Sequence, residues 1–206
     1  LDLVTAADRA VETLIATRIA ATFGDAVLGE EHGRSTGAGG GLWIVDPIDG
    51  TYNFVHDYPR WCVSLGYLQD GVQEIGVIYA PPTDQLYVAR RGHGATRNGQ
   101  RLSIEAAPGP QRPLIEIGTT PARPLANFLT VIERLVGNGI EFRRVGSGAL
   151  GIAQVATGEI DGYHEAFMYP WDVAAATLIV REAGGYASNF FGRPGWEVGG
   201  AMLACN

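Results

Sequence analysis

The spacing of apolar residues predicts the elements in the first quarter of the chain. Across residues 5–23 they recur every three or four positions after an opening threonine, which predicts an amphipathic helix with an N-cap. Two short apolar runs, 26–28 and 42–45, predict buried strands. The second strand is expected to end at Asp46, because Pro47 cannot continue a hydrogen-bonded ladder.

The next stretch is typical of an antiparallel meander. Strands are predicted at 62–69, 72–79 and 85–89, with Asp70-Gly71 and a pair of prolines at the two turns. An Asn-Gly pair then marks a hairpin before a short strand at 101–104.

The pattern changes after residues 106–113, which hold three prolines and a glycine and form the best candidate for a domain boundary. Strands and helices alternate beyond it: strand 114–117, helix 124–136, strand 141–145, helix 149–157, strand 161–165, helix 172–183, and strands near 186 and 202. We therefore predict an α+β protein with mixed and antiparallel sheets covered by helices. Residues 1–108 are expected to form one subdomain and 109–206 the other.

Composition and charge exclude several classes of protein. The chain has 206 residues, of which 46% are hydrophobic and 18% charged, so a globular fold is expected. The net charge of −7 disfavours nucleic acid and anionic membranes as partners. The longest largely apolar stretch, 173–180, which includes Thr177, is too short to span a bilayer, and no leader is visible. Two cysteines without a CxxC spacing favour a reducing cytoplasm.

All fifteen basic residues are arginine, and the chain contains no lysine. A Walker A loop, a Schiff-base lysine and a pyridoxal-phosphate anchor each need a lysine ammonium. This chain supplies none of the three.

Two carboxylates follow the second predicted strand within one short segment, Asp46-Pro47-Ile48-Asp49-Gly50-Thr51. Oxygen ligands suit Mg²⁺, and a glycine at the start of a helical turn lets a phosphate approach backbone N–H groups. The segment therefore favours a combined metal and phosphate site. A capped turn with solvated aspartates is the alternative.

Further acidic residues lie at the ends of other predicted elements. Glu30 and Glu31 follow a glycine at a strand end, and Asp172 opens a predicted helix, where it could simply serve as an N-cap. If these carboxylates converged with Asp46 and Asp49, they would repel one another unless cations neutralised them.

These segments resemble the signature segments of the inositol monophosphatase family. The similarity rests on Gly29-Glu30-Glu31, on 46–54 and on 171–185, and it extends over the whole chain. It implies an αβαβα sugar-phosphatase fold, Mg²⁺ dependence and inhibition by Li⁺. Family members are expected to carry further helices beyond both ends of this chain.

The resemblance also implies roles for individual residues. The first metal would be held by Glu30, Asp46 and the Ile48 carbonyl, the second by Asp46, Asp49 and Asp172, and a third by Glu30 with waters. Asp8 and Thr51 would orient the attacking water, so that the catalytic set is Asp8, Glu30 and Thr51. Phosphate would contact Gly50 and Thr51, and Glu31 would support the ligands from behind.

The same resemblance implies a substrate rim at Ser147, Gly148 and Glu165, where Glu165 would accept hydrogen bonds from polyol hydroxyls. A glycine at 148, where animal members resemble one another in carrying alanine, weakens strict selectivity for inositol. The segment Gly146-x-Gly148-x-x-Gly151 also matches a dinucleotide fingerprint, a weaker alternative. Arg143 and Arg144 are expected on the solvated surface.

We therefore predict a cytoplasmic phosphatase that uses two or three Mg²⁺ ions to hydrolyse a small polyol or sugar monophosphate, with inositol-1-phosphate as the leading candidate. Histidinol phosphate, fructose 1,6-bisphosphate and a nucleotide phosphate remain alternatives on the same metal core. A regulatory module that docks to the transcription machinery is the rival from another class. A homodimer is expected, with Phe190 and Phe191 as candidate interface residues.

Overall fold

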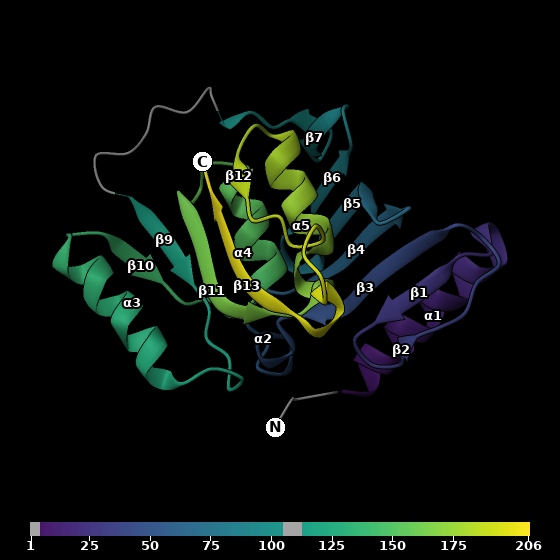
Figure 1. Cartoon of the computed structure of the whole chain (residues 1–206), viewed down its shortest axis with the longest axis horizontal. Coiled ribbons are helices and arrows are strands. Elements are labelled where there is room, and N and C mark those ends of the chain that lie inside the picture. Colours follow the sequence, from purple (N-terminus) through teal and green to yellow (C-terminus); the bar gives the residue numbers. More distant parts are fainter. Residues whose placement is uncertain (1–4, 105–112) are drawn as a thin grey trace.

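The computed structural model describes residues 5–104 and 113–206, which form alternating layers of helices and sheets. Helix α1 covers one face of the first sheet, α4 and α5 lie between the two sheets, and α3 lies outside the second (Figure 1). This is the αβαβα arrangement that the family resemblance implied. The candidate boundary at 108/109 lies outside the described residues.

The first sheet has eight strands in the order β2-β1-β3-β4-β5-β6-β7-β8. Strand β1 pairs with β3 in parallel, and β3 to β8 form the predicted antiparallel meander. The strands are β1 Ala26–Gly29, β2 Gly33–Arg34, β3 Gly41–Asp49, β4 Cys62–Gln69, β5 Val72–Ala80, β6 Gln85–Arg90, β7 Gly94–Arg97 and β8 Gln100–Arg101.

The second sheet has five strands in the order β10-β9-β11-β13-β12, of which β9 is parallel to both of its neighbours. These strands are β9 Leu114–Ile117, β10 Glu141–Arg143, β11 Gly162–Met168, β12 Tyr186–Ala187 and β13 Gly200–Cys205. The helices are α1 Ala6–Phe23, α2 Thr51–Val55, α3 Leu125–Gly137, α4 Gly148–Val155 and α5 Pro170–Glu182, with short 3-10 turns at Pro81–Thr83 and Trp196–Val198.

Helix α5 packs closely against the first sheet because both surfaces are made of small residues. A Cβ atom on Gly66 would lie 2.4 Å from the Cβ of Ala174, and one on Gly76 would lie 2.6 Å from the carbonyl oxygen of Ala175. Any larger residue at these positions would push the helix away from the sheet. The close packing fixes where the first turn of α5, with Asp172, stands relative to β3.

Three sequence predictions need correction. The strand expected to end at Asp46 continues to Asp49, because β3 passes Pro47 in a bulge and pairs with β4 again beyond it. The strand expected at 101–104 is reduced to β8, Gln100–Arg101. Phe190 is fully buried and Phe191 packs against the core, so the pair does not offer the exposed interface that we expected.

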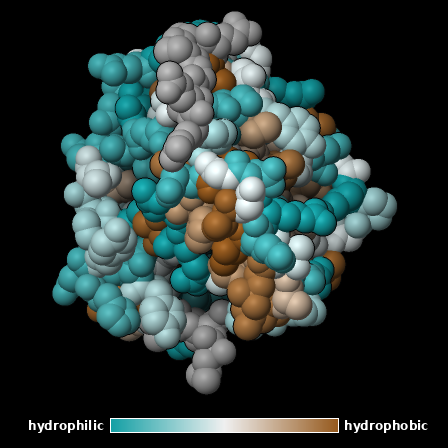
Figure 2. All heavy atoms as spheres, turned by 90° about the vertical axis from the view of Figure 1, so that its left-hand side faces the viewer, coloured by the Kyte–Doolittle hydropathy of each residue, from teal (hydrophilic) through white to brown (hydrophobic). Residues whose placement is uncertain are grey.

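Helix α3 is the most exposed helix that the structure describes, with no buried residue. Leu125, Leu129 and Val136 on α3 are all exposed, and Figure 2 shows apolar residues gathered in a band on the face of the molecule to which α3 belongs. Across residues 5–104 and 113–206, no helix combines the length and the apolar character that a membrane crossing requires.

Candidate metal centre

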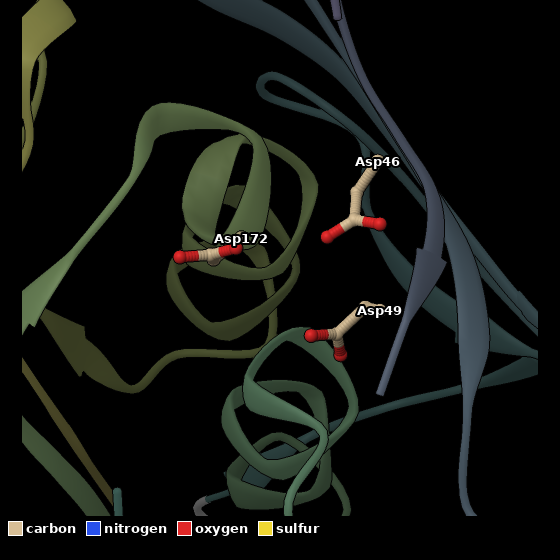
Figure 3. A group of neighbouring side chains, drawn as sticks. All are labelled: Asp46, Asp49 and Asp172. Carbon is tan, nitrogen blue, oxygen red and sulfur yellow. The ribbon is translucent and has the colours of Figure 1, made fainter. Parts of the chain in front are cut away.

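A bulge in β3 brings Asp46 and Asp49 to the same side of the first sheet. Residues three apart in a regular strand point to opposite faces, but the register of β3 against β4 shifts between these two positions. Both side chains therefore point toward Asp172 in the first turn of α5 (Figure 3). One oxygen atom from each of the three carboxylates lies within 4.8 Å of the other two.

The three carboxylates destabilise one another's ionised forms. Burial raises the pKa of Asp46 well above its usual range, and the charges of Glu30, Asp49 and Asp172 raise it further. Burial also raises the pKa of Asp172 strongly, with the charge of Asp49 as the next cause. A divalent cation among the three would remove this repulsion.

Asp49 is held in place by the N-terminus of α4. Its carboxylate accepts hydrogen bonds from the Ser147 hydroxyl, from the Gly148 N–H at 3.1 Å and from the Ala149 N–H at 2.9 Å. A carboxylate at a helix N-terminus is stabilised by the free N–H groups and the helix dipole. These donors limit the rise in the pKa of Asp49 that burial causes.

This contact also decides against the dinucleotide alternative. A dinucleotide fingerprint presents the first N–H groups of its helix to a pyrophosphate. In α4 these groups already bind Asp49, and a Cβ atom on Gly151 would lie 2.9 Å from the carboxyl carbon of Glu116 rather than against an open groove. The glycines of this segment serve the packing of α4 beside Asp49.

Asp8 and Thr51 meet beside the three carboxylates. The Thr51 hydroxyl lies 3.1 Å from the Ile48 carbonyl oxygen and 3.4 Å from Asp8 Oδ1, so it can donate its proton to either. Asp8 is fully buried and also caps α1 by accepting a hydrogen bond from the Thr5 N–H at 2.8 Å. The structure thus brings together two residues that are 43 positions apart.

Glu30 stands in the turn between β1 and β2, beside the three carboxylates. Its charge raises the pKa values of both Asp46 and Asp172. It is not one of the three residues whose oxygens lie within 4.8 Å. The neighbouring Glu31 turns toward α1, where its carboxylate lies 3.7 Å from the Arg9 guanidinium.

A cavity of about 180 Å³ opens next to Asp49 and Asp172, and Glu165 forms part of its wall. The Tyr163 hydroxyl donates a 2.7 Å hydrogen bond to Glu165. Burial raises the pKa of Glu165 to about 7, although this hydrogen bond acts in the opposite direction. Ser147 and Gly148 also line the cavity, but their hydroxyl and N–H groups bind Asp49.

A second, larger cleft of about 890 Å³ adjoins this cavity and reaches Glu30, Gly50 and Thr51. Gly50 adopts a left-handed conformation with φ of 96°, which few other residues tolerate. Arg144 is exposed and borders both hollows. It therefore lies at the rim of the site, although the sequence placed it only on the solvated surface.

The donor set fits a hard divalent cation such as Mg²⁺. The carboxylates of Asp46, Asp49 and Asp172 offer only oxygen, and such ions take oxygen ligands. The Cys62 thiol lies 3.6 Å from Asp49, but burial raises its pKa well above the usual range. It stays protonated and is not a ligand for a hard ion.

Sequence reasoning missed Arg60, Glu116 and Glu12. Glu116 lines the smaller cavity, and its carboxylate pairs with Arg60 at 2.6 Å. Glu12 accepts hydrogen bonds from the turn that carries Glu30. A charged residue within the apolar strand 114–117 was a usable signal for Glu116, whereas nothing in the spacing of α1 singles out Glu12.

Fold and site together define a protein with a cluster of carboxylates that could hold a metal ion beside a polar cavity. The chain belongs to the inositol monophosphatase family, which residues 1–205 match. The Nus factor SuhB of Escherichia coli K12 is 36% identical over 209 residues, covering 100% of this chain and 78% of the relative.

Solved structures of similar proteins agree with this assignment. The crystal structure of extragenic suppressor protein SuhB from Bartonella henselae has a TM-score of 0.85 at 34% identity, over 98% of this chain and 81% of that one. Inositol monophosphatase II of Staphylococcus aureus with inositol monophosphate bound has a TM-score of 0.80 at 36% identity, over 97% and 78%. The same enzyme has been solved with 2′-AMP bound.

Proposed function

We propose that this protein is a Mg²⁺-dependent phosphatase that hydrolyses the phosphate monoester of a small polyol or sugar, with inositol-1-phosphate as the leading candidate. The observation that carries the proposal is the group of Asp46, Asp49 and Asp172, whose oxygens lie within 4.8 Å of one another beside a polar cavity. Phosphate monoesters resist hydrolysis because an anion must be attacked and an alkoxide expelled. Bound Mg²⁺ would supply Lewis acidity and lower the pKa of a water.

The residues around this centre would have three roles: metal binding, proton transfer and phosphate binding. Asp46, Asp49, Asp172, Glu30 and the Ile48 carbonyl would hold two to three ions. Asp8 would accept a proton from the attacking water through the Thr51 hydroxyl, because these side chains are 3.4 Å apart. Gly50 and Thr51 would contact the phosphate. Since the chain contains no lysine, transition-state charge would be met chiefly by metal and backbone N–H groups.

Substrate choice would depend on Glu165 and Arg144. Glu165 stands in the wall of the cavity, where a carboxylate can accept hydrogen bonds from the hydroxyls of a neutral polyol. Arg144 at the rim could contact an anionic or planar group of a larger substrate. This residue keeps the nucleotide and bisphosphate alternatives open, and histidinol phosphate would use the same metal core.

The proposal is tested by assaying phosphate release from inositol-1-phosphate, histidinol phosphate, fructose 1,6-bisphosphate and 2′-AMP with Mg²⁺. We expect turnover of inositol-1-phosphate that disappears in Asp46→Asn. Normal turnover in that variant would refute the mechanism, and release from histidinol phosphate alone would overturn the substrate. Glu165→Gln should weaken inositol-1-phosphate turnover more than that of 2′-AMP.

A regulatory function is the second candidate, because relatives 36% identical to the chain are named Nus factors. Such a protein would act by docking to the transcription machinery rather than by catalysis. The exposed apolar side chains of Leu125, Leu129 and Val136 on α3 are the candidate surface. A binding assay with RNA polymerase tests this function. Equal binding by the wild type and by the Asp46→Asn variant would support it.

A homodimer remains a prediction, and with Phe190 buried the face that carries α3 is now the candidate interface. Light scattering on the purified protein would give its mass in solution. Leu129→Glu should lower that mass from two chains to one if α3 forms the interface. A cytoplasmic location also stays a prediction.

A further inference from the structure

A buried carboxylate on α1, that of Glu12, binds the backbone of the turn that carries Glu30. Glu30, Glu31 and His32 connect β1 to β2. Glu12 Oε2 accepts a 2.8 Å hydrogen bond from the Glu31 N–H, and Glu12 Oε1 accepts one of 2.9 Å from the His32 N–H. Two of the three backbone N–H groups in this turn are therefore bound by one side chain.

Gly29 is required for this contact. A Cβ atom on Gly29 would lie 2.2 Å from the carboxyl carbon of Glu12, a separation that real Cβ atoms do not reach. The glycine before the two glutamates therefore makes room for a side chain from a different element. Glu12 itself is 2% exposed, so its carboxylate has given up almost all contact with water.

Holding this turn with a buried negative charge costs free energy, because other carboxylates lie nearby. The charge of Glu12 helps to raise the pKa of Glu31, for which burial and the charge of Asp8 are larger causes, while the His32 ring nitrogen Nδ1 lies 2.9 Å from Glu12 Oε1. A neutral amide side chain would add no repulsion, but it offers one acceptor oxygen, whereas the two N–H groups bind separate oxygens of Glu12. Charge-assisted hydrogen bonds are shorter and stronger, however, and would hold the two residues that follow Glu30 more firmly.

We propose that Glu12 is a positioning residue that fixes the Glu31 and His32 backbone and thereby sets the affinity of the centre for Mg²⁺ through Glu30. It contacts neither substrate nor metal. This inference rests on the proposed function, in which Glu30 is a ligand. Groups that hydrogen-bond a metal ligand directly typically change metal affinity about 10–100-fold when they are replaced, and Glu12 acts one step further out, on the two residues that follow Glu30.

The test is a calorimetric titration of the metal-free protein with MgCl₂ at 25 °C, after circular dichroism has checked that each variant is folded. Glu12→Gln keeps the size of the side chain but turns an amide N–H₂ toward at least one backbone N–H. We expect its Mg²⁺ dissociation constant to rise about 10-fold. Thr13→Ala, an exposed neighbour on α1 whose hydroxyl donates only to the Arg9 carbonyl, is the matched control and should bind Mg²⁺ like the wild type.

Gly29→Ala disrupts the same contact by changing the turn instead of α1. It keeps the inference testable if Glu12→Gln does not fold. It should raise the dissociation constant similarly, since the new methyl group displaces the Glu12 carboxylate. Unchanged Mg²⁺ affinity in both variants, with only a lower melting temperature, would overturn the inference and leave Glu12 a structural cap. Absence of Mg²⁺ binding in the wild type would instead overturn the proposed function, and the inference with it.

Discussion

Arg60 and Glu116 form an ion pair, 2.6 Å long and largely shielded from water, that joins the two halves of the site. Arg60 lies between α2 and β4, whereas Glu116 belongs to β9 in the second sheet. The Arg60 carbonyl also accepts a 2.6 Å hydrogen bond from Asn53, whose amide donates to the Val145 carbonyl as well. The segment after Gly50 is thereby tied to the segment before Ser147.

Arg60→Met should destabilise the protein by about 3–5 kcal/mol at pH 8, because it leaves the Glu116 carboxylate buried without its partner. The loss should be smaller at pH 5.5, where Glu116 is protonated, since its pKa is already about 7 in the wild type. Urea unfolding at both pH values measures this. Arg97→Met, which breaks a more exposed pair with Glu159 far from the site, should cost less than about 1 kcal/mol. Equal losses at both pH values would contradict the expectation.

The metal-free protein should become less stable as the pH rises from about 5 to 7.5. Burial raises the pKa values of Glu116 and Glu165 from 4.5 to about 7, so the folded state binds more protons than the unfolded chain across this range. Each carboxyl group therefore contributes its full stabilisation below its pKa in the unfolded chain. This stabilisation is lost as the pH rises toward the pKa of the group in the folded protein, by up to about 1.4 kcal/mol per pH unit for each group.

Urea unfolding in EDTA at several pH values would measure this slope, and Glu165→Gln should flatten it. Saturating MgCl₂ should stabilise the protein more at pH 8 than at pH 5.5, because deprotonated carboxylates bind the ion. A metal-free protein that gains stability between pH 5 and 7.5 would show that other groups dominate.

Asp46→Asn should stabilise the metal-free protein while abolishing its response to Mg²⁺. The variant removes one of the charges that repel Glu30, Asp49 and Asp172, a gain on the order of 1 kcal/mol. Thermal unfolding with and without MgCl₂ would show a higher melting temperature in EDTA and little further rise on adding the metal. A lower melting temperature in EDTA would contradict this expectation and indicate that the charge of Asp46 strengthens its hydrogen bond from the Ile48 N–H by more than the repulsion costs.

Ser147→Ala should raise the Mg²⁺ concentration needed for half-maximal activity about 10-fold, while the KM for substrate changes little. The Ser147 hydroxyl donates to Asp49 rather than pointing into the cavity as a free group, so its loss acts on a metal ligand. Steady-state kinetics with varied Mg²⁺ and varied inositol-1-phosphate separate the two effects. A rise in KM alone would restore the interpretation of Ser147 as a substrate-binding residue.

Most of the fold could be predicted because local patterns agree with it. The strands β4, β5 and β6 could be predicted from the turn residues between them. The start of α1 could be predicted from Thr5, which is the N-cap residue of its capping box. The bulge at Pro47 could not be predicted, because a proline normally ends ladder pairing and only the long pairing of β3 with β4 on one side carries the strand past it.

The candidate site was only partly predictable for a similar reason. Asp46 and Asp49 stand out because they are close in sequence, Glu30 and Asp172 because they lie at the ends of other predicted elements, and the family resemblance adds Asp8. The side chains that hold them in place come from distant elements, as with Glu12 on α1, and carry no local signal. The role of Ser147 likewise depends on α4 meeting β3, a packing event between residues 98 positions apart.

The close packing of α5 on Gly66 and Gly76 has a consequence for how the three aspartates come together as the chain folds. Asp46 and Asp49 arrive with the meander, but Asp172 reaches them only when the helix layer has docked between the sheets. A partly folded chain in which α5 has not docked would bring together only two of the three aspartates. It would lack the third carboxylate for binding an ion. Mg²⁺ binding during refolding would therefore report the docking of α5 on the first sheet rather than the formation of either sheet alone.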